Sequence, residues 1–236
     1  MQKIHLVNEG QRIDGTLFIP DNNQKNPGVI FMHGLTSSED KYISIAKELM
    51  EQGIASMTVN MRGHGTSEGN IDSLTMLDNI RDAFLVYDFF IKQNGIDADR
   101  IGILGSSYGC VLASIVSIKR QVKSLVLRAP AAYTDEMMKM KFGLLLKKEK
   151  KVFHTLPYIK DTKIIKAISK FKGDLLIITS ENDDIVPSSI PETIFNEASQ
   201  AGKKKLKVIK NATHRLSEIQ LKEFTSLAIA WFKETL

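Results

Sequence analysis

Cysteine is nearly absent from the sequence, and its scarcity excludes one kind of architecture. The one cysteine, Cys110, cannot form a disulfide within the chain, and such usage is compatible with a reducing compartment. The five histidines include no H-E-x-x-H spacing and no paired Cys/His ligands accompany them. We therefore expect no metal site.

Long apolar runs and concentrated charge are missing as well. No segment approaches the run of about 18 apolar residues that a membrane helix needs, so we expect no stable membrane insertion. Residues 1–6 contain no apolar core of a secretory signal, which predicts a cytoplasmic protein. The formal net charge of +5 is spread along the chain, whereas nucleic-acid binders gather basic residues on one face. Nucleic acid is therefore not an expected partner.

What the sequence does contain is an alternation of short apolar runs and longer helical patterns. With 236 residues, 43% of them hydrophobic, the chain fits a single α/β domain over residues 1–236. The alternation predicts βαβ units and an eight-stranded, mostly parallel sheet with helices on both faces. Strands are expected at 4–8, 12–19, 28–32, 54–60, 101–104, 124–127, 175–179 and 206–209, the first two antiparallel about a turn at 9–10. Helices are expected at 41–52, from a cap at Asp72 or Ser73 to about residue 94, at 107–119 and at 217–235.

A candidate nucleophile lies between a predicted strand and a predicted helix. Residues 105–109 read Gly-Ser-Ser-Tyr-Gly and match G-x-S-x-G, with Ser107 at the central position. In this motif the serine occupies a sharp strand-to-helix turn, and the flanking glycines let the backbones pass without a side-chain clash. Only Ser107 has glycine two residues to either side, so Ser106 is expected to be a neighbouring packing or substrate-side residue. Cys110, on the following helix, is expected to be a small buried side chain.

The acid and the base are expected just beyond two later strands. His214 follows the strand at 206–209, and Asp183 follows the strand at 175–179, so the chain order is Ser, Asp, His. His214 would take the proton from Ser107, and the acid would orient the imidazole. Asp184 and then Glu181 are the alternatives to Asp183, and an exposed acidic turn without chemistry is the plain interpretation.

An oxyanion hole requires two N–H donors aimed at the developing negative charge. The Tyr108 N–H, directly after the nucleophile, is one candidate, and the Leu35 N–H, in the loop after the strand at 28–32, is the other. Gly34 would let this loop approach the nucleophile, and His33 would order it. His33, Gly34 and Ser106 are therefore expected at the border of the substrate site. A plain glycine turn is the alternative for the loop at 33–38.

These motifs resemble those of the α/β-hydrolase superfamily over nearly the whole chain. The match is carried by His33-Gly34, the segment at 60–69, the motif at 105–109 and the Asp183/His214 pair. The chain is most similar to compact bacterial esterases of the cinnamoyl/feruloyl kind, and to serine aminopeptidase-like and monoacylglycerol lipase-like hydrolases. The resemblance implies the α/β-hydrolase fold and a cofactor-free hydrolase acting on small-molecule esters. The sequence departs from the family pattern where Asn60-Met61 replaces a usual Asp, where Ser180 precedes the acid, and where Ala212-Thr213 precedes His214.

Residues 131–172 lie between two predicted strands without a strong strand pattern, and we interpret them as a small cap. Within them, residues 137–151 combine an apolar face with a basic end. Met138, Phe142 and His154 are the candidate substrate contacts. A lid over an acyl chain, transient contact with an anionic membrane and an amphipathic helix with a solvated Lys face all fit this pattern.

The sequence thus predicts a serine carboxylic ester hydrolase that works through an acyl-enzyme. A peptidase or amidase would use the same nucleophile, base and acid, so it is the second hypothesis. A non-catalytic ligand-binding homologue is the third hypothesis. The sequence is compatible with a homodimer.

Overall fold

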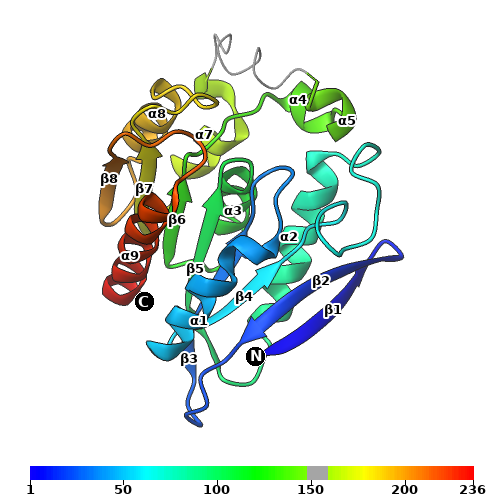
Figure 1. The fold of residues 1–236 in the computed structure, drawn as a ribbon, viewed down its shortest axis with the longest axis vertical. Coiled ribbons are helices and arrows are strands. Elements are labelled where there is room, and N and C mark those ends of the chain that lie inside the picture. Colours follow the sequence, from blue (N-terminus) through cyan, green and yellow to red (C-terminus); the bar gives the residue numbers. More distant parts are fainter. Residues whose placement is uncertain (148–158) are drawn as a thin grey trace.

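The computed structural model describes residues 1–147 and 159–236, and its centre is a mixed sheet. Within the described residues this sheet has eight strands, the predicted number, and their order is β1-β2-β4-β3-β5-β6-β7-β8 (Figure 1). The strands are β1 (Gln2–Asn8), β2 (Gln11–Phe18), β3 (Asn26–Met32), β4 (Ala55–Val59), β5 (Ile96–Ser106), β6 (Ser124–Arg128), β7 (Asp174–Ser180) and β8 (Lys204–Ile209). The pairs β1/β2 and β2/β4 are antiparallel, and the others are parallel.

The hairpin that joins β1 to β2 is the predicted antiparallel pair. Asn8 pairs with Gln11, so the turn consists of two residues, Glu9 and Gly10. Both have positive φ, 50° and 75°. Such a turn matches the right-handed twist of the flanking strands, and glycine accommodates its second position without strain.

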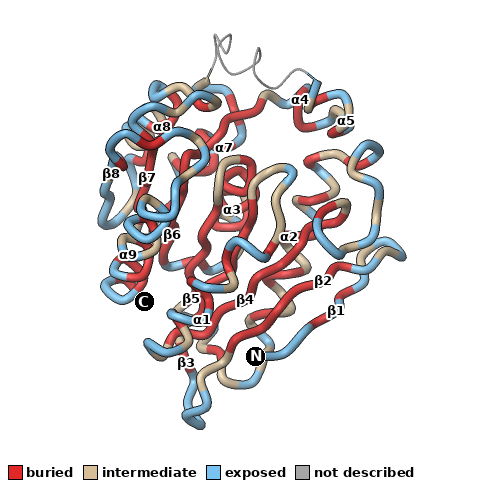
Figure 2. The backbone as a smooth tube through the Cα atoms, in the orientation of Figure 1, coloured by how far each residue is buried: buried red, intermediate tan, exposed pale blue. Residues whose placement is uncertain are grey.

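Helices cover both faces of the sheet because its strands alternate two sets of buried side chains. On β3, Val29 and Phe31 point to one hydrophobic cluster, whereas Ile30 and Met32 point to the other. The first cluster includes α1 (Ile43–Glu51) and α9 (Glu218–Thr235). The second includes α2 (Met76–Phe90), α3 (Gly109–Ser117), α7 (Lys163–Ile168) and α8 (Ser189–Glu197). Figure 2 shows the buried backbone concentrated along the strands between these layers.

The start of α2 differs from the prediction. Its N-cap is Thr75, not Asp72 or Ser73, and Thr75 and Asp78 form a reciprocal capping box. Ser73 donates instead to the Asn70 carbonyl, and the Asp72 N–H donates to the Asn70 side chain, so both belong to the preceding turn. The helix also ends at Phe90 rather than near residue 94. The helix α8 was not predicted.

The segment at 131–172 contains several short elements with different surroundings. Its last helix, α7, packs against α3 and contributes Ile164 and Ile168 to the core, so it belongs to the helical layer. The helices α4 (Asp135–Lys139) and α5 (Phe142–Leu145) lie apart from α7 near the start of α2, and a 3-10 turn spans Ile159–Asp161 (Figure 1). His154 and the basic end of the segment at 148–151 lie outside the described residues. No helix among the described residues is long and apolar enough to span a membrane.

Candidate active site

The strand β5 turns sharply into α3 at Ser107. Ser107 has φ of 51°, in the left-handed region that a residue with a side chain rarely adopts. The glycines of the motif are explained by close contacts: a Cβ on Gly109 would overlap the Met32 carbonyl oxygen, and one on Gly105 would lie 2.7 Å from the Cys110 Cα. The Ser107 N–H donates to the Arg128 carbonyl at 2.8 Å, which ties the turn to the end of β6.

Three side chains far apart in the sequence form a continuous hydrogen-bonded chain at this turn. The Nε2 of His214 lies 3.2 Å from the Ser107 Oγ, and its Nδ1 lies 3.0 Å from each carboxylate oxygen of Asp183. The carboxylate is buried, with 3% of its side chain exposed, and the imidazole is 16% exposed. An Nδ1–H that donates to Asp183 leaves Nε2 as the acceptor for the serine hydroxyl. The arrangement can therefore move a proton from Ser107 to His214.

The Asp183 carboxylate is held ionised by its hydrogen bonds. Burial by itself would raise its pKa, but the His214 hydrogen bond and the N–H groups of Val186 and Ile185 more than offset this, and the pKa lies below its usual value. The N–H groups of Ile185 and Val186 donate to Asp183 Oδ1 at 3.0 and 2.8 Å. An ionised acid is the form that stabilises a developing imidazolium.

The two alternative acids contact the histidine loop rather than the imidazole. Asp184 accepts from the His214 N–H at 3.2 Å. Glu181 forms an ion pair with Lys210 at 2.7 Å and accepts from the Asn211 N–H at 2.8 Å. The Asn182 N–H adds a bond to the Ala212 carbonyl at 2.8 Å. The acidic loop thus fastens the segment that carries the imidazole, and only Asp183 orients the ring.

The loop after β3 lies beside the nucleophile, as an oxyanion loop would. A Cβ placed on Gly34 would lie 3.7 Å from the Ser107 Cβ. Within residues 1–147 and 159–236, neither the Leu35 N–H nor the Tyr108 N–H donates to a protein acceptor. Tyr108 is the N-cap of α3, where unpaired N–H groups carry partial positive charge. The two backbone groups are therefore available for an oxyanion.

His33 is fully buried and both of its ring nitrogens are used by the protein. Its Nδ1 bonds the Gly34 carbonyl at 2.8 Å and its Nε2 accepts from the Met61 N–H at 3.0 Å. Burial and the neighbouring His64 lower the pKa of His33 to about 3, so the ring is neutral near pH 7. His33 orders the loop, and these contacts leave it no free polar atom for a substrate. The Ser106 side chain lies near the Tyr42 hydroxyl and opposes the rise that burial causes in the pKa of Tyr42.

Among the predicted cap contacts, Met138 and Phe142 lie inside the protein. They are 2% and 0% exposed. Phe142 packs edge-on against Tyr108 and His64, with ring centroids 5.5 and 6.0 Å apart, and Tyr133 contacts the other side of this aromatic cluster at 6.4 Å from Tyr108. Phe142 thus lies near the nucleophile turn through its contact with Tyr108. A substrate contact by Met138 or Phe142 stays a prediction.

Sequence reasoning missed Arg128, which lies beneath the triad at the end of β6. It is 7% exposed, and its guanidinium donates to the Ser180 Oγ at 3.3 Å. Burial lowers the pKa of Arg128, and the negative charge of Asp183 opposes this shift. A charged residue directly after the apolar run at 124–127 was the signal that could have revealed it. No group of three or more His, Cys, Asp or Glu side chains that could hold a metal occurs in the part of the chain that the structure describes.

Comparisons with known proteins show the family and the fold of this chain. A family model described as Hydrolase_4, serine aminopeptidase, S33, matches residues 23–170, which is more than half of the chain. An uncharacterized protein of Mycobacterium tuberculosis is 23% identical over 211 residues, which cover 89% of this chain and 71% of that protein.

Two solved structures share the architecture over nearly the whole chain. Est1E from Butyrivibrio proteoclasticus, with ferulic acid bound, superposes with a TM-score of 0.80 at 21% identity, covering 98% of both chains. Acetyl xylan esterase 1 from a Thermoanaerobacterium species has a TM-score of 0.73 at 18% identity, covering 98% of this chain and 82% of that one. At these identities the likeness establishes the α/β-hydrolase fold.

Proposed function

The chain belongs to the α/β-hydrolase family described as serine aminopeptidase, S33, and from this premise we propose that it hydrolyses carboxylic esters through an acyl-enzyme. Small, medium and hydroxycinnamoyl acyl groups are the proposed substrates. Esterases with the same fold, one of them with ferulic acid bound, support an ester rather than another acyl compound.

The proposed reaction has two halves that use the same groups. The Ser107 Oγ attacks the ester carbonyl while the Nε2 of His214 takes its proton, and the Leu35 and Tyr108 N–H groups hold the oxyanion. The protonated imidazole then gives its proton to the departing alcohol, and an acyl-enzyme remains. Water activated by His214 attacks this ester, the acid leaves, and the proton returns to Ser107.

The observation that supports this proposal most strongly is the unbroken hydrogen-bonded chain from Ser107 to Asp183. The His214 Nε2 lies 3.2 Å from the Ser107 Oγ, and the His214 Nδ1 lies 3.0 Å from the Asp183 Oδ1. Ser107 itself has φ of 51°. Strained backbone at a nucleophile persists only where the surrounding structure over-determines it. A merely structural strand–helix turn has no need of this conformation.

The test is turnover of p-nitrophenyl acetate and butyrate by the wild type and by Ser107→Ala. We expect the variant to lose on the order of 10⁴-fold or more in kcat, because removal of a triad member leaves only binding and oxyanion stabilisation. Ser114→Ala is a matched control, because Ser114 is buried on α3 and donates to the Cys110 carbonyl at 2.7 Å. Full activity in Ser107→Ala would refute the proposed nucleophile.

Amide cleavage is the second candidate, because the family description names an aminopeptidase. An acidic group that could hold a substrate amine would favour this candidate, and Glu181, one acidic side chain beside the His214 loop, is already paired with Lys210. Aminoacyl anilides assayed beside short, long, hydroxycinnamoyl and monoacylglycerol esters would separate the two. A non-catalytic homologue would leave a fluorophosphonate probe unbound.

A further inference from the structure

The loop between β4 and α2 has no part in the proposed proton transfer, yet it is linked to both predicted oxyanion donors, through His33 to the Leu35 side and through Asn79 to the Tyr108 side. The loop spans residues 60–69 and contains three glycines with positive φ, Gly63, Gly65 and Gly69. A side chain on Gly65 would overlap the Asn60 side chain, so the loop is closely folded on itself. Asn60 in turn accepts from the Glu39 N–H at 2.8 Å.

One contact joins this loop to the Leu35 side of the oxyanion hole. The Met61 N–H donates to His33 Nε2 at 3.0 Å, and His33 Nδ1 bonds the Gly34 carbonyl at 2.8 Å. Because the two ring nitrogens bind the two loops, the imidazole fixes the distance between them. Leu35 follows directly on Gly34, so its N–H direction depends on this bridge.

A second contact joins the same loop to the Tyr108 side. The Arg62 carbonyl, one residue after Met61, accepts from Asn79 Nδ2 at 3.2 Å. Asn79 Oδ1 accepts in turn from the Tyr108 hydroxyl at 2.9 Å. Tyr108 is fully buried, so its ring is held at both ends: by its backbone at the nucleophile turn and by its hydroxyl at Asn79.

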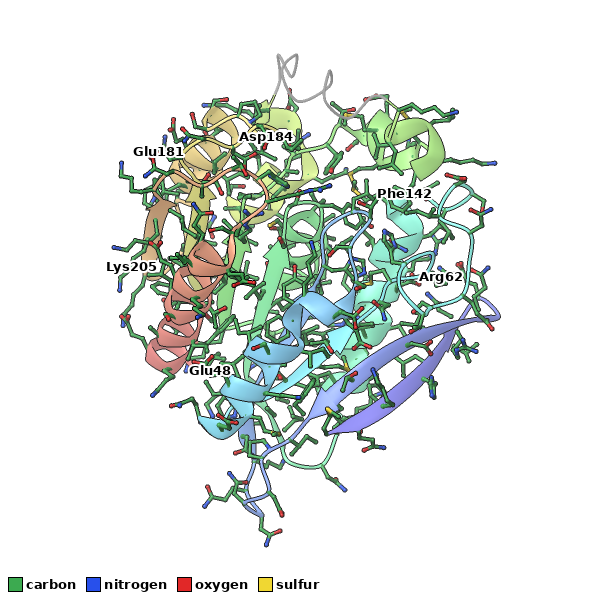
Figure 3. The ribbon with its side chains drawn as sticks, viewed as in Figure 1. Glu48, Arg62, Phe142, Glu181, Asp184 and Lys205 are labelled. Atoms are coloured by element: carbon green, nitrogen blue, oxygen red, sulfur yellow. The ribbon has the colours of Figure 1, made fainter. Side chains whose placement is uncertain are left out.

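A buried ion pair supports both contacts. Arg62 Nε donates to Asp82 Oδ1 at 2.8 Å, with the two side chains 2% and 0% exposed. Asp82 also accepts from Asn79 at 3.1 Å and from Asn8 at 2.7 Å. A fully satisfied polar network of this kind is rigid, because any displacement leaves a buried polar group unpaired. Figure 3 shows Arg62 on the α2 side of the molecule, below Phe142.

We propose that the loop at 60–69 positions both donors of the oxyanion hole. It orients the Leu35 N–H through the positioning residue His33, and it orients the Tyr108 N–H through the positioning residue Asn79. This inference rests on the proposed function and adds the residues that determine its transition-state geometry. Oxyanion donors must lie close to the position of the developing charge, and small misplacements of reacting groups reduce rates strongly.

The test is Tyr108→Phe, which removes only the hydroxyl that contacts Asn79 and keeps the backbone N–H. We expect kcat for p-nitrophenyl butyrate to fall about tenfold, less than the 10²–10³-fold cost of losing a whole donor. KM should change little, because the substrate carbonyl is bound more weakly than the oxyanion. The preference for the oxygen ester over its thionoester should fall too, because sulfur is a weak acceptor that depends less on the hole.

Tyr87→Phe is the matched control. Tyr87 is a buried tyrosine on α2 whose hydroxyl donates to the Gln121 carbonyl at 2.6 Å. It loses the same kind of bond, so its melting temperature should fall comparably while kcat and the thionoester preference stay at the wild-type values. Asn79→Ala should reproduce the loss in Tyr108→Phe, and the double variant should be no slower than the slower single variant.

The outcomes separate this inference from the function it rests on. A wild type that neither turns over esters nor binds a fluorophosphonate overturns the proposed function and the inference together. An active wild type with equal kcat and thionoester preference in Tyr108→Phe overturns the inference alone. Failure of both Tyr108→Phe and Asn79→Ala to fold, while Tyr87→Phe folds, also overturns it, because the network would then serve stability rather than geometry.

Discussion

The two sides of the candidate active site are built in contrasting ways. The base side consists of the loops at 181–184 and 210–214, which carry Asp183 and His214. An ion pair at the surface joins these loops, and its Lys210 and Glu181 side chains are 76% and 35% exposed. The oxyanion side consists of the loops at 33–38 and 60–69. Its ion pair, between Arg62 and Asp82, is buried, with side chains 2% and 0% exposed. Figure 3 shows Glu181 and Asp184 near the ends of β7 and β8, far from Arg62.

The difference has an energetic consequence. Exposed ion pairs contribute little to stability, because water and salt screen them and the long side chains lose entropy. A buried pair is strongly destabilising to break, because the remaining partner is left as an uncompensated charge. Breaking the exposed Glu181–Lys210 pair should therefore leave stability nearly unchanged, whereas breaking the buried Arg62–Asp82 pair should destabilise the fold.

The largest expected effect tests the base side. Asp183→Asn should lower kcat by about 10⁴-fold, because an amide cannot hold the imidazole in the required tautomer. Asp184→Asn should stay within about threefold, because Asp184 contacts only the His214 N–H and an amide oxygen can still accept it. Steady-state turnover of both variants, with circular dichroism to verify folding, measures this. A larger loss in Asp184→Asn would reverse the assignment.

The next effect tests the oxyanion side. Asp82→Ala should destabilise the protein by about 3–5 kcal/mol, because it leaves the Arg62 guanidinium buried without its carboxylate. Glu181→Gln, which breaks an exposed ion pair, should leave the unfolding midpoint nearly unchanged. Urea unfolding of the two variants gives the comparison. Equal midpoints would remove the contrast between the two sides.

The smallest effect is a pH dependence on the base side. The folded-state pKa of Asp183 lies below its ordinary value of about 3.9, so folding favours its ionised form. Its contribution to stability is therefore present above about pH 4 and is lost as pH falls through the lowered folded-state pKa. The difference between the free energies of unfolding of the wild type and Asp183→Asn should be constant above about pH 4 and should shrink as pH falls from about 4 through the lowered folded-state pKa. A gap that stays constant over this range would show that the Asp183 charge is not involved.

The parts of the fold that follow local patterns could be predicted from the sequence. The eight strands could be predicted from short apolar, often β-branched runs bounded by turns, and Ser107 could be predicted because glycine stands two residues to either side of it. The cap of α2 could have been found as well, since Thr75 and Asp78 have capping-box spacing. Helix α8 was not predicted because it contains Pro191, a residue that usually ends a helix. Pro191 is tolerated here because it lies in the first turn, where the backbone N–H groups have no partner within the helix.

The connections between elements were beyond sequence reasoning. The Asn79 contact to Tyr108 and the Arg62 contact to Asp82 join residues that no periodicity relates. The pairing of Glu181 with the histidine loop likewise depends on β7 and β8 being neighbours. Residue types at the site could be predicted, but the hydrogen bonds that position them are products of the packed fold.

The most direct measurement of the central claim is the mass of the protein after brief mixing with p-nitrophenyl butyrate and an acid quench, followed by peptide mapping. A transient butyryl group on the peptide that contains Ser107, absent from Ser107→Ala, is the predicted result. Steady ester turnover with an acyl group on another residue, or with the same adduct in Ser107→Ala, would contradict the account.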